Sequence, residues 1–314
     1  MAEAAPLPLR RGASAQRLRA RATYAALAVA AVLIAAKFAA WLGTGSVALL
    51  SSLVDSLVDA AASLVTFFAV RHAAVPADRE HRFGHGKAEP LAALGQSAFL
   101  VGSAMLLMAE AVRRLISPTP VEHAWGGIAV MVFSIVVTLG LVGYQRHVIR
   151  ETGSIAIGAD EVHYRSDLLL NLSVIAALAL GSALQAPILD PLFGGAIGLW
   201  IISGAVRIAR LSLVQLMDRE MPDEERAQVR KIAEAHPEVA AVHDIRTRIA
   251  GPTKFIQLHI EMDGGISLLQ AHRISDTVEA DLRHAFPHAE IIIHEDPAGI
   301  EEPVAFPAPS AAVR

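Results

Sequence analysis

Cysteine is absent from this chain of 314 residues. Its absence excludes disulfide bonds, cysteine nucleophiles and thiolate metal ligands, so any metal ion must be held by oxygen and imidazole groups. Charged residues are also few, at 18% of the chain, and the formal net charge of −4 is too small to argue for a nucleic-acid partner. The sequence has no HExxH, GxxxxGKS/T or GxSxG motif, so it does not support a zinc protease, an ATPase or a standard hydrolase. We therefore expect a protein that is not an enzyme.

Apolar residues, in contrast, make up 54% of the chain and come in long blocks. A helix needs about 20 apolar residues to cross the hydrocarbon core of a bilayer. Six blocks approach or exceed this length, which predicts a polytopic membrane protein with an all-α, six-helix transmembrane domain. The predicted spans are residues 22–42, 46–70, 90–116, 124–146, 154–184 and 187–210.

Arginine and lysine gather at alternate ends of these spans. They precede the first span and follow the second, fourth and sixth, whereas the connections at residues 43–46 and 183–187 carry neither. Only Arg113 and Arg114, at the end of the third span, run against this bias. By the positive-inside rule, the basic ends face the cytoplasm. We expect a multi-pass protein of the cell (inner) membrane with both termini in the cytoplasm.

The composition changes after about residue 213. Two segments with helical spacing, 221–236 and 267–286, alternate with strand-like segments in the order αββαβ, which predicts a small α+β domain of the metallochaperone or ferredoxin-like kind. The predicted organisation is a disordered N-terminal tail that is not a cleaved signal, a six-helix transmembrane domain, a cytoplasmic metal-binding domain and a disordered C-terminal tail. The respective ranges are 1–21, 22–212, 213–297 and 298–314.

Two pairs of polar residues interrupt the apolar spans. Asp55 and Asp59 lie in the second span at i and i+4, and His163 and Asp167 repeat this spacing in the fifth. Each pair lies on one helix face near the membrane midplane, where a carboxylate costs roughly 2.5–3.5 kcal/mol. A divalent cation such as Zn²⁺, held by three carboxylates and one imidazole, would offset this cost. Hydrogen bonds or a salt bridge between helices are the alternative.

Further histidines lie outside the spans. Asp78, His81 and His85 have i+3 and i+4 spacings in the loop PADREHRFGHGKAEP, although such residues are usually just solvated. Another set occurs on predicted strands and a helix of the α+β domain, where sequence spacing alone proves nothing; it consists of His243, His259, His272, His294 and Asp296. The remaining histidines are interpreted as solvated or interfacial, and they are His72, His123, His147, His236, His284 and His288.

Several longer motifs follow one another along nearly the whole chain. They are SLVDSLVDAAAS, FGHGKAEPLAALGQS, HYRSDLLLN, LMDREMPDEE, HDIRTR, GPTKFIQLHIEM and IIIHEDP. With these motifs the chain resembles the cation diffusion facilitator family, and within it the bacterial zinc and iron efflux transporters. The resemblance implies a homodimer that exports divalent metal cations against protons.

The same resemblance assigns residues to sites. It implies a transport site of Asp55, Asp59, His163 and Asp167, and a cytoplasmic loop site of Asp78, His81 and His85. It also implies a binuclear cytoplasmic site made by His243, His259, His272, His294 and Asp296. Finally, it implies a charge pair between Lys87 and Asp218 that interlocks the two domains near the dimer interface. Glu295 stands where relatives can carry glutamine.

We therefore expect a proton-coupled antiporter that exports Zn²⁺, with Cd²⁺ and Fe²⁺ as further substrates, by alternating access around a midplane site. His163 can release a proton when metal binds, because imidazole titrates near neutral pH. The expected partners are a second copy of the chain, metal cations, protons and the lipid bilayer, with Zn²⁺ also as a regulatory or structural ion. Two alternatives remain open: a membrane-anchored metal sensor without transport, and an intramembrane metalloenzyme that uses a metal-bound water.

Overall fold

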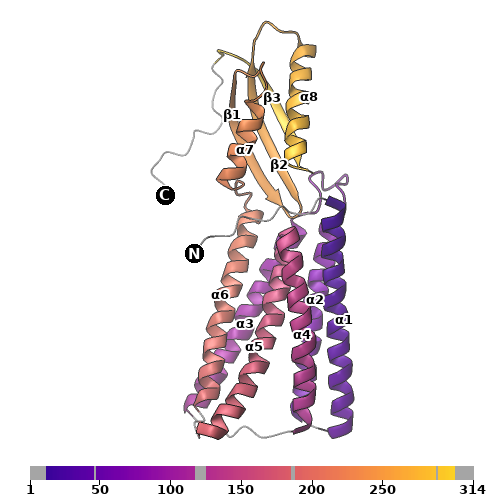
Figure 1. The fold of residues 1–314 in the computed structure, drawn as a ribbon, viewed down its shortest axis with the longest axis vertical. Helices are drawn as coiled ribbons and strands as arrows, with labels where there is room; N and C mark the ends of the chain where they lie inside the picture. Colours follow the sequence, from indigo (N-terminus) through magenta and orange to yellow (C-terminus); the bar gives the residue numbers. More distant parts are fainter. Residues whose placement is uncertain (1–11, 46, 117–124, 185–187, 288, 301–314) are drawn as a thin grey trace. The chain divides into compact units, whose positions relative to one another are not determined.

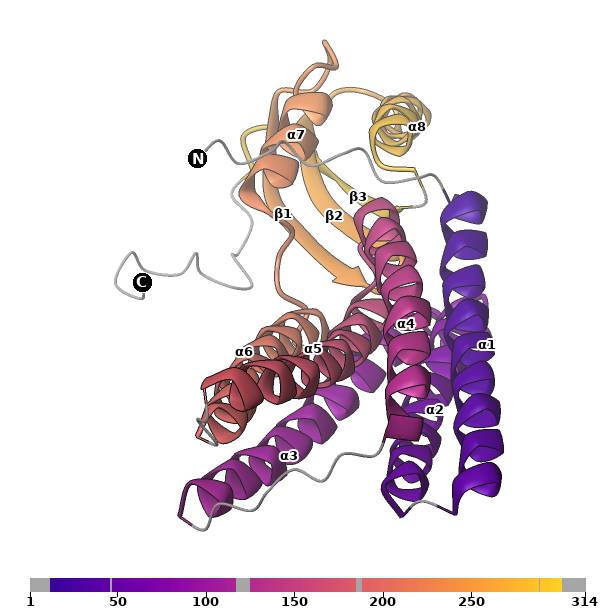
Figure 2. The same cartoon turned by 60° about the horizontal axis from the view of Figure 1, so that its bottom comes forward.

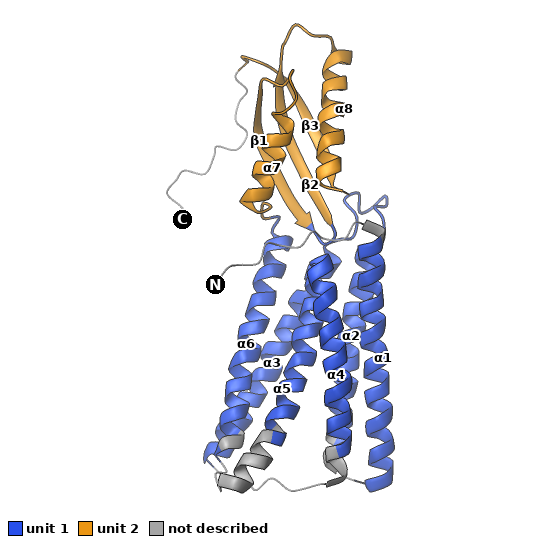
Figure 3. Ribbon diagram, viewed as in Figure 1, with its two compact units in different colours: residues 1–218, 250–252 blue, residues 219–249, 253–314 orange. Residues whose placement is uncertain are grey.

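The computed structural model describes residues 12–45, 47–116, 125–184, 188–287 and 289–300 (Figure 1). The chain divides into two compact units, coloured separately in Figure 3. The first unit comprises residues 1–218 with 250–252, and the second comprises residues 219–249 with 253–314.

Helices make up the first unit. They are α1 (Gly12–Thr44), α2 (Val47–Ala73), α3 (Ala88–Ile116), α4 (Trp125–Thr152), α5 (Ile155–Leu184) and α6 (Leu189–Leu216). Five of them, α1 to α4 and α6, are long and apolar enough to cross a membrane. The 30-residue α5 has a matching length and packs against α4 and α6. The predicted fold class, a helical transmembrane domain with a small α+β domain, is confirmed.

Two groups of contacts hold these helices together (Figure 2). The helices α1, α2, α4 and α5 pack in a ring, while α3 runs along α6 and also contacts α2 and α5. Gly198 allows a close contact between α3 and α6: a Cβ atom built there would lie 2.8 Å from Sδ of Met108, so the methionine side chain would have to shift. Small residues that let helix backbones approach closely are the usual means of helix association in lipid.

The start of α1 differs from the prediction. Residues 12–21 are helical rather than disordered, whereas residues 1–11 and 301–314 of the predicted tails lie outside the described residues. The physical reason is tertiary contact: Nη2 of the buried Arg19 donates to the Thr152 carbonyl oxygen over 2.5 Å, and its Nη1 lies 3.5 Å from Oε2 of Glu89. Glu89 also accepts a hydrogen bond from Ser154. The first helical turns are therefore anchored to α3 and to the junction of α4 and α5.

The second unit contains α7 (Asp223–Ala233), β1 (Ala241–Ala250) except its last residue, β2 (Thr253–Met262), α8 (Leu268–Ala285) and β3 (Glu290–Pro297). The sheet has the order β1-β2-β3, with β2 and β3 parallel. The two residues between β1 and β2 form a tight turn that only antiparallel neighbours permit. The helices α7 and α8 contact each other and contribute to one apolar core with the sheet. In the β2–β3 register, His259 lies opposite His294.

Candidate metal centres

The first candidate centre joins α2 to α5 within the first unit. Nε2 of His163 lies 2.8 Å from Oδ1 of Asp59 and 3.8 Å from Oδ2 of Asp167. One ligand atom from each of these residues, which we call the membrane cluster, lies within 4.8 Å of the others. The i, i+4 spacing on α5 accounts for the pairing of His163 with Asp167, because such residues share a helix face. These atoms can converge on one cation.

One buried carboxylate oxygen of the membrane cluster lacks a hydrogen-bond donor among the described residues. Oδ2 of Asp167 is buried and makes no hydrogen bond among the described residues. A buried carboxylate oxygen without a donor is costly, and a cation at this position would supply the missing interaction. Asp55, predicted in the same site, lies one turn before Asp59 on α2 but is exposed and stands outside the group of converging atoms.

A buried polar network supports the membrane cluster, and the sequence analysis missed it. Asp160 accepts hydrogen bonds from Oγ of Ser63 over 2.9 Å and from Nε2 of Gln145 over 2.7 Å. Ser63 also lies 2.9 Å from the Tyr164 hydroxyl, and all four side chains are buried. The network ties α2, α4 and α5 together one helical turn from the membrane cluster. Its only sequence signal is a further carboxylate inside a predicted span, which marks a functional or partnered residue.

A lysine inside α1, which the sequence pattern does not connect with the site, hydrogen-bonds to α2. Lys37 donates from Nζ to Oγ of Ser56 over 2.7 Å and to the Ser52 carbonyl oxygen over 3.1 Å. Its ammonium group interacts electrostatically with the nearby aspartates Asp55, Asp59 and Asp167. This positive charge partly balances the carboxylates of the membrane cluster.

The second candidate centre lies in the loop between α2 and α3. Oδ1 of Asp78 lies 3.4 Å from Nδ1 of His81, and its Oδ2 lies 3.3 Å from Nε2 of His85. These three residues, the loop cluster, again offer ligand atoms within 4.8 Å of one another. Backbone N–H groups of His81 and Glu80 donate to Asp78 and lower the pKa of its carboxyl group below the usual value. The carboxylate is therefore ionised, as metal ligation requires.

The third candidate centre stands on the sheet of the second unit. The carboxylate of Asp296 lies 3.3 Å from Nε2 of His243, 2.8 Å from Nδ1 of His259 and 3.2 Å from Nε2 of His294. His243, His259 and Asp296, the sheet cluster, offer ligand atoms within 4.8 Å of one another. The side chain of Asp296 is only 3% exposed, and its Oδ1 is the oxygen that lies 3.2 Å from Nε2 of His294, in an ion-pair contact whose geometry is not that of a hydrogen bond. This donor set suits a divalent cation.

Not every predicted member of this third centre lies there. His272 is exposed on α8, where its Nε2 lies 3.5 Å from Oδ2 of Asp276, and it stands outside the sheet cluster. Two acidic residues that the sequence analysis did not name do approach the centre. Glu261 lies 3.5 Å from His243, and Asp244 lies 3.7 Å from His259. Arg246 hydrogen-bonds to Asp244 and holds the pKa of that carboxyl group below its usual value.

Lys87 and Asp218, the predicted charge pair, both belong to the first unit, and Nζ of Lys87 lies 2.9 Å from Oδ1 of Asp218.

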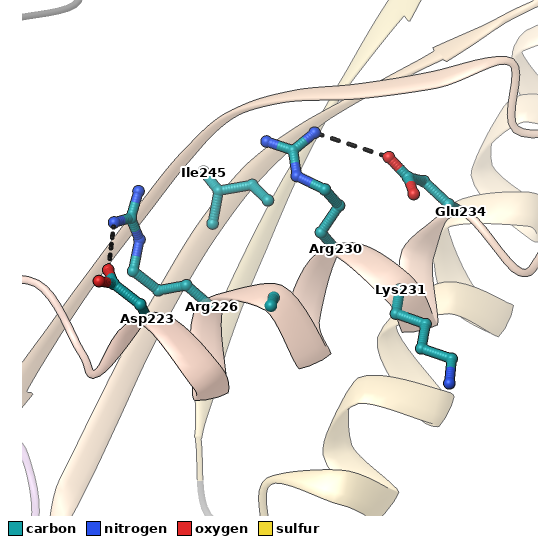
Figure 4. Close-up of a pocket in the computed structure, with 7 residues that line it drawn as sticks. Asp223, Arg226, Arg230, Lys231, Glu234 and Ile245 are labelled. Atoms are coloured by element: carbon teal, nitrogen blue, oxygen red, sulfur yellow. Dashed lines mark hydrogen bonds and ion pairs between the residues drawn. The ribbon is translucent and has the colours of Figure 1, made fainter.

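A hollow on α7 differs from the three metal centres in its lining. It is lined by Arg226, Arg230 and neighbouring residues, and these two arginines form ion pairs with Asp223 and Glu234 along the helix (Figure 4). This hollow contains none of the clustered histidines.

Two domains of known proteins match this chain, one in the helical part and one in the α+β part. Residues 23–217 match the cation efflux transmembrane domain, and residues 221–298 match the cytoplasmic domain of cation efflux proteins. The chain is 47% identical over 284 residues to the cation-efflux pumps FieF of Cronobacter sakazakii and Serratia proteamaculans, covering 90% of this chain and 94% of each relative. A solved structure, the metal-bound C-terminal domain of the CzcD transporter from Thermotoga maritima, is 27% identical with a TM-score of 0.25, over 26% of this chain and 100% of that one.

Proposed function

The chain belongs to the cation efflux family, and from this premise we propose that it exports Zn²⁺ from the cytoplasm in exchange for protons. It is a multi-pass membrane protein of metal cation efflux. Cd²⁺ and Fe²⁺ are further substrates in this proposal, because a site of three carboxylates and one imidazole accepts several divalent transition metals. The membrane is the cell (inner) membrane, with both termini in the cytoplasm.

The observation that carries the proposal is the membrane cluster. Asp59, His163 and Asp167 meet between two apolar helices, and a buried oxygen of Asp167 makes no hydrogen bond among the described residues. Asp55, one turn away on α2, completes a four-ligand set when its exposed side chain turns toward the ion. Zn²⁺ favours such a tetrahedral set of oxygen and nitrogen ligands.

Proton exchange follows from the chemistry of the same ligands. Metal binding requires neutral imidazole and ionised carboxylates, so an arriving cation displaces any protons held there. In the reverse step, protons that enter from the outer side compete with the ion for His163 and the aspartates. Alternate exposure of the membrane cluster to the two sides of the membrane then couples outward metal movement to inward proton movement.

The other two clusters have a different role in this proposal. The loop cluster and the sheet cluster belong to polar segments outside the spanning helices. Cations at the sheet cluster, with His294 and with His272, hold two copies of the chain together as a homodimer and adjust the rate of transport. The buried carboxylate of Asp296, which faces the imidazoles of His243, His259 and His294, supports metal ligation there.

Flux into sealed vesicles tests the proposal. The purified full-length protein is reconstituted with a Zn²⁺ indicator inside, and a pH gradient is imposed. We expect Zn²⁺ uptake that rises with the gradient and collapses when a protonophore removes it. Zn²⁺ uptake whose rate does not depend on the pH gradient would overturn proton coupling. No uptake at all, with Zn²⁺ still bound, would instead support a membrane-anchored sensor. Competition with Cd²⁺, Fe²⁺ and Mn²⁺ in the same vesicles measures substrate preference.

A further inference from the structure

A fourth potential ligand lies beside the loop cluster. His72, in the last turn of α2, has its ring centroid 4.5 Å from that of His85, with 65° between the ring planes. The His81 ring is likewise 4.5 Å from the His85 ring. The rings of His72 and His81 thus both lie against the ring of His85, and His81 and His85 approach the carboxylate of Asp78.

The orientation of His85 favours ligation over simple ring packing. Nδ1 of His85 lies 3.4 Å from the Val75 carbonyl oxygen, and its Nε2 lies 3.3 Å from Oδ2 of Asp78. Metal-ligating histidines commonly donate one ring N–H to a carbonyl oxygen and use the other nitrogen for the ion. The side chain of His85 is 5% exposed, so this orientation is held by packing. A rigid histidine thus stands next to the more exposed Asp78, His81 and His72.

We propose that His72 is the fourth ligand of the loop cluster, which then offers three imidazoles and one carboxylate to a divalent transition cation such as Zn²⁺. This inference rests on the proposed metal-binding role of Asp78, His81 and His85. The His72 nitrogens stand outside the group of atoms within 4.8 Å, so its side chain rotates when the ion binds. His72 is exposed, and its rotation displaces no core residue.

A fourth ligand changes what the loop cluster does. Three protein ligands leave an open position for water or for transfer of the ion, whereas four protein ligands close the tetrahedral shell. A set rich in nitrogen also favours Zn²⁺ over Mn²⁺ or Mg²⁺, which prefer oxygen. The loop cluster with His72 thus retains its cation and links the end of α2 to the loop before α3.

The test uses the full-length protein in detergent, with the other two clusters disabled by Asp59→Ala, His163→Ala, His243→Ala and His259→Ala. Co²⁺ is the probe, because its visible absorption reports tetrahedral coordination, and Zn²⁺ is titrated in competition. Three variants are compared in this background: His72→Ala, His81→Ala and His147→Ala. His147 is an exposed histidine on α4 and serves as the matched control.

We expect His72→Ala to weaken Co²⁺ and Zn²⁺ binding at least about 10-fold, as His81→Ala does, because loss even of outer-shell partners costs about 10- to 100-fold. His147→Ala should leave the affinity unchanged. If His72→Ala behaves like His147→Ala while His81→Ala weakens binding, His72 is no ligand and the three-residue loop site stands. If His81→Ala also has no effect, the loop site itself fails, and the inference fails with it.

A second variant tests ligation directly. The chain has no cysteine, so His72→Cys introduces a unique thiol. If residue 72 enters the coordination shell, Co²⁺ gives a sulfur-to-metal charge-transfer band that the parent lacks. Co²⁺ bound with parental affinity and without this band would overturn the proposal.

Discussion

Asp218 accepts a hydrogen bond from Nζ of Lys87 over 3.0 Å, although 131 positions separate the two residues in sequence. Asp218 follows α6 with a positive φ of 52°, a backbone conformation that aspartate tolerates better than most residues. Lys87 directly precedes α3, and its Nζ also donates to the Leu216 carbonyl oxygen over 3.4 Å. The pair therefore fastens the beginning of α3 to the end of α6.

The first prediction concerns this pair. The two side chains are 40% and 42% exposed in the single chain, where such a pair contributes about 0–1 kcal/mol. If a second copy of the chain covers them, removal of one partner strands a charge and costs about 3–5 kcal/mol. We expect Lys87→Met and Asp218→Asn each to weaken the dimer more than 10-fold, measured by analytical ultracentrifugation in detergent.

The double variant supplies the control for this prediction. Asparagine is chosen because it also tolerates a positive φ, so the backbone strain stays constant. Lys87→Met with Asp218→Asn should be no worse than the more damaging single change, since neither charge is then left unpaired. Additive losses would mean that the two residues act independently.

The second prediction concerns the membrane cluster. Asp59→Ala or His163→Ala removes a ligand, so we expect Zn²⁺ flux in vesicles to fall at least about 100-fold while the helices remain packed. Asp55→Ala should have a similar effect, although Asp55 stands outside the group of converging atoms. Ser166→Ala, on the same helix as His163, is the matched control and should keep its flux. Parental flux in Asp59→Ala or His163→Ala would refute the transport assignment.

The third prediction concerns the sheet cluster. A cation present at 100 times its dissociation constant stabilises the folded state by about 2.7 kcal/mol. We expect His259→Ala combined with His294→Ala to remove most of the Zn²⁺-dependent rise in the thermal midpoint of the second unit. Transport should slow but persist, because these residues do not belong to the membrane cluster. His284→Ala, on exposed α8 surface, should retain the full rise. Complete loss of flux with intact dimers would contradict a regulatory role.

The fourth prediction concerns the network around Asp160. Both carboxylate oxygens of Asp160 accept hydrogen bonds, whereas an asparagine has only one side-chain oxygen. Asp160→Asn therefore leaves a buried donor of Ser63 or Gln145 unpaired, at a cost of about 1–3 kcal/mol. We expect a lower thermal midpoint and a raised KM for Zn²⁺. Adding Gln145→Glu restores complementary hydrogen bonding, since the new carboxylate can accept from asparagine, and should recover part of both losses. Unchanged stability in Asp160→Asn would show that the network is dispensable.

The sequence predicts those features that depend on residues close together in the chain, namely the helices and the side-chain pairs within one helix. Apolar blocks predict the six helices to within a few residues at most ends, and the i, i+4 spacing of His163 and Asp167 predicts their shared helix face, on which they lie 3.8 Å apart. Contacts between distant segments could not be read in this way. Asp160 and Gln145 meet across two helices, and only the folded chain reveals the hydrogen bond.

The same limit applies to the histidines. The sequence alone predicts a solvated or interfacial His72, whereas in the structure its ring lies against that of His85. The family resemblance groups His272 with the sheet histidines, whereas within this chain it lies near Asp276 on the surface of α8. That His272 belongs to the binuclear site stays a prediction. It requires His272 to approach the sheet cluster of a second copy of the chain.

The anchoring of Arg19 has a consequence for biosynthesis. Its contacts reach 70 residues ahead to Glu89 and 133 residues ahead to Thr152. Protein synthesis adds about 5–20 residues per second, so Thr152 is synthesised roughly 7 to 27 s after Arg19. During that interval its guanidinium group has to remain hydrated at the membrane surface. The N-terminal turns of α1 can therefore be held by the Thr152 carbonyl oxygen only after α4 has been synthesised, although α2 and α3 lie between α1 and α4 in the chain.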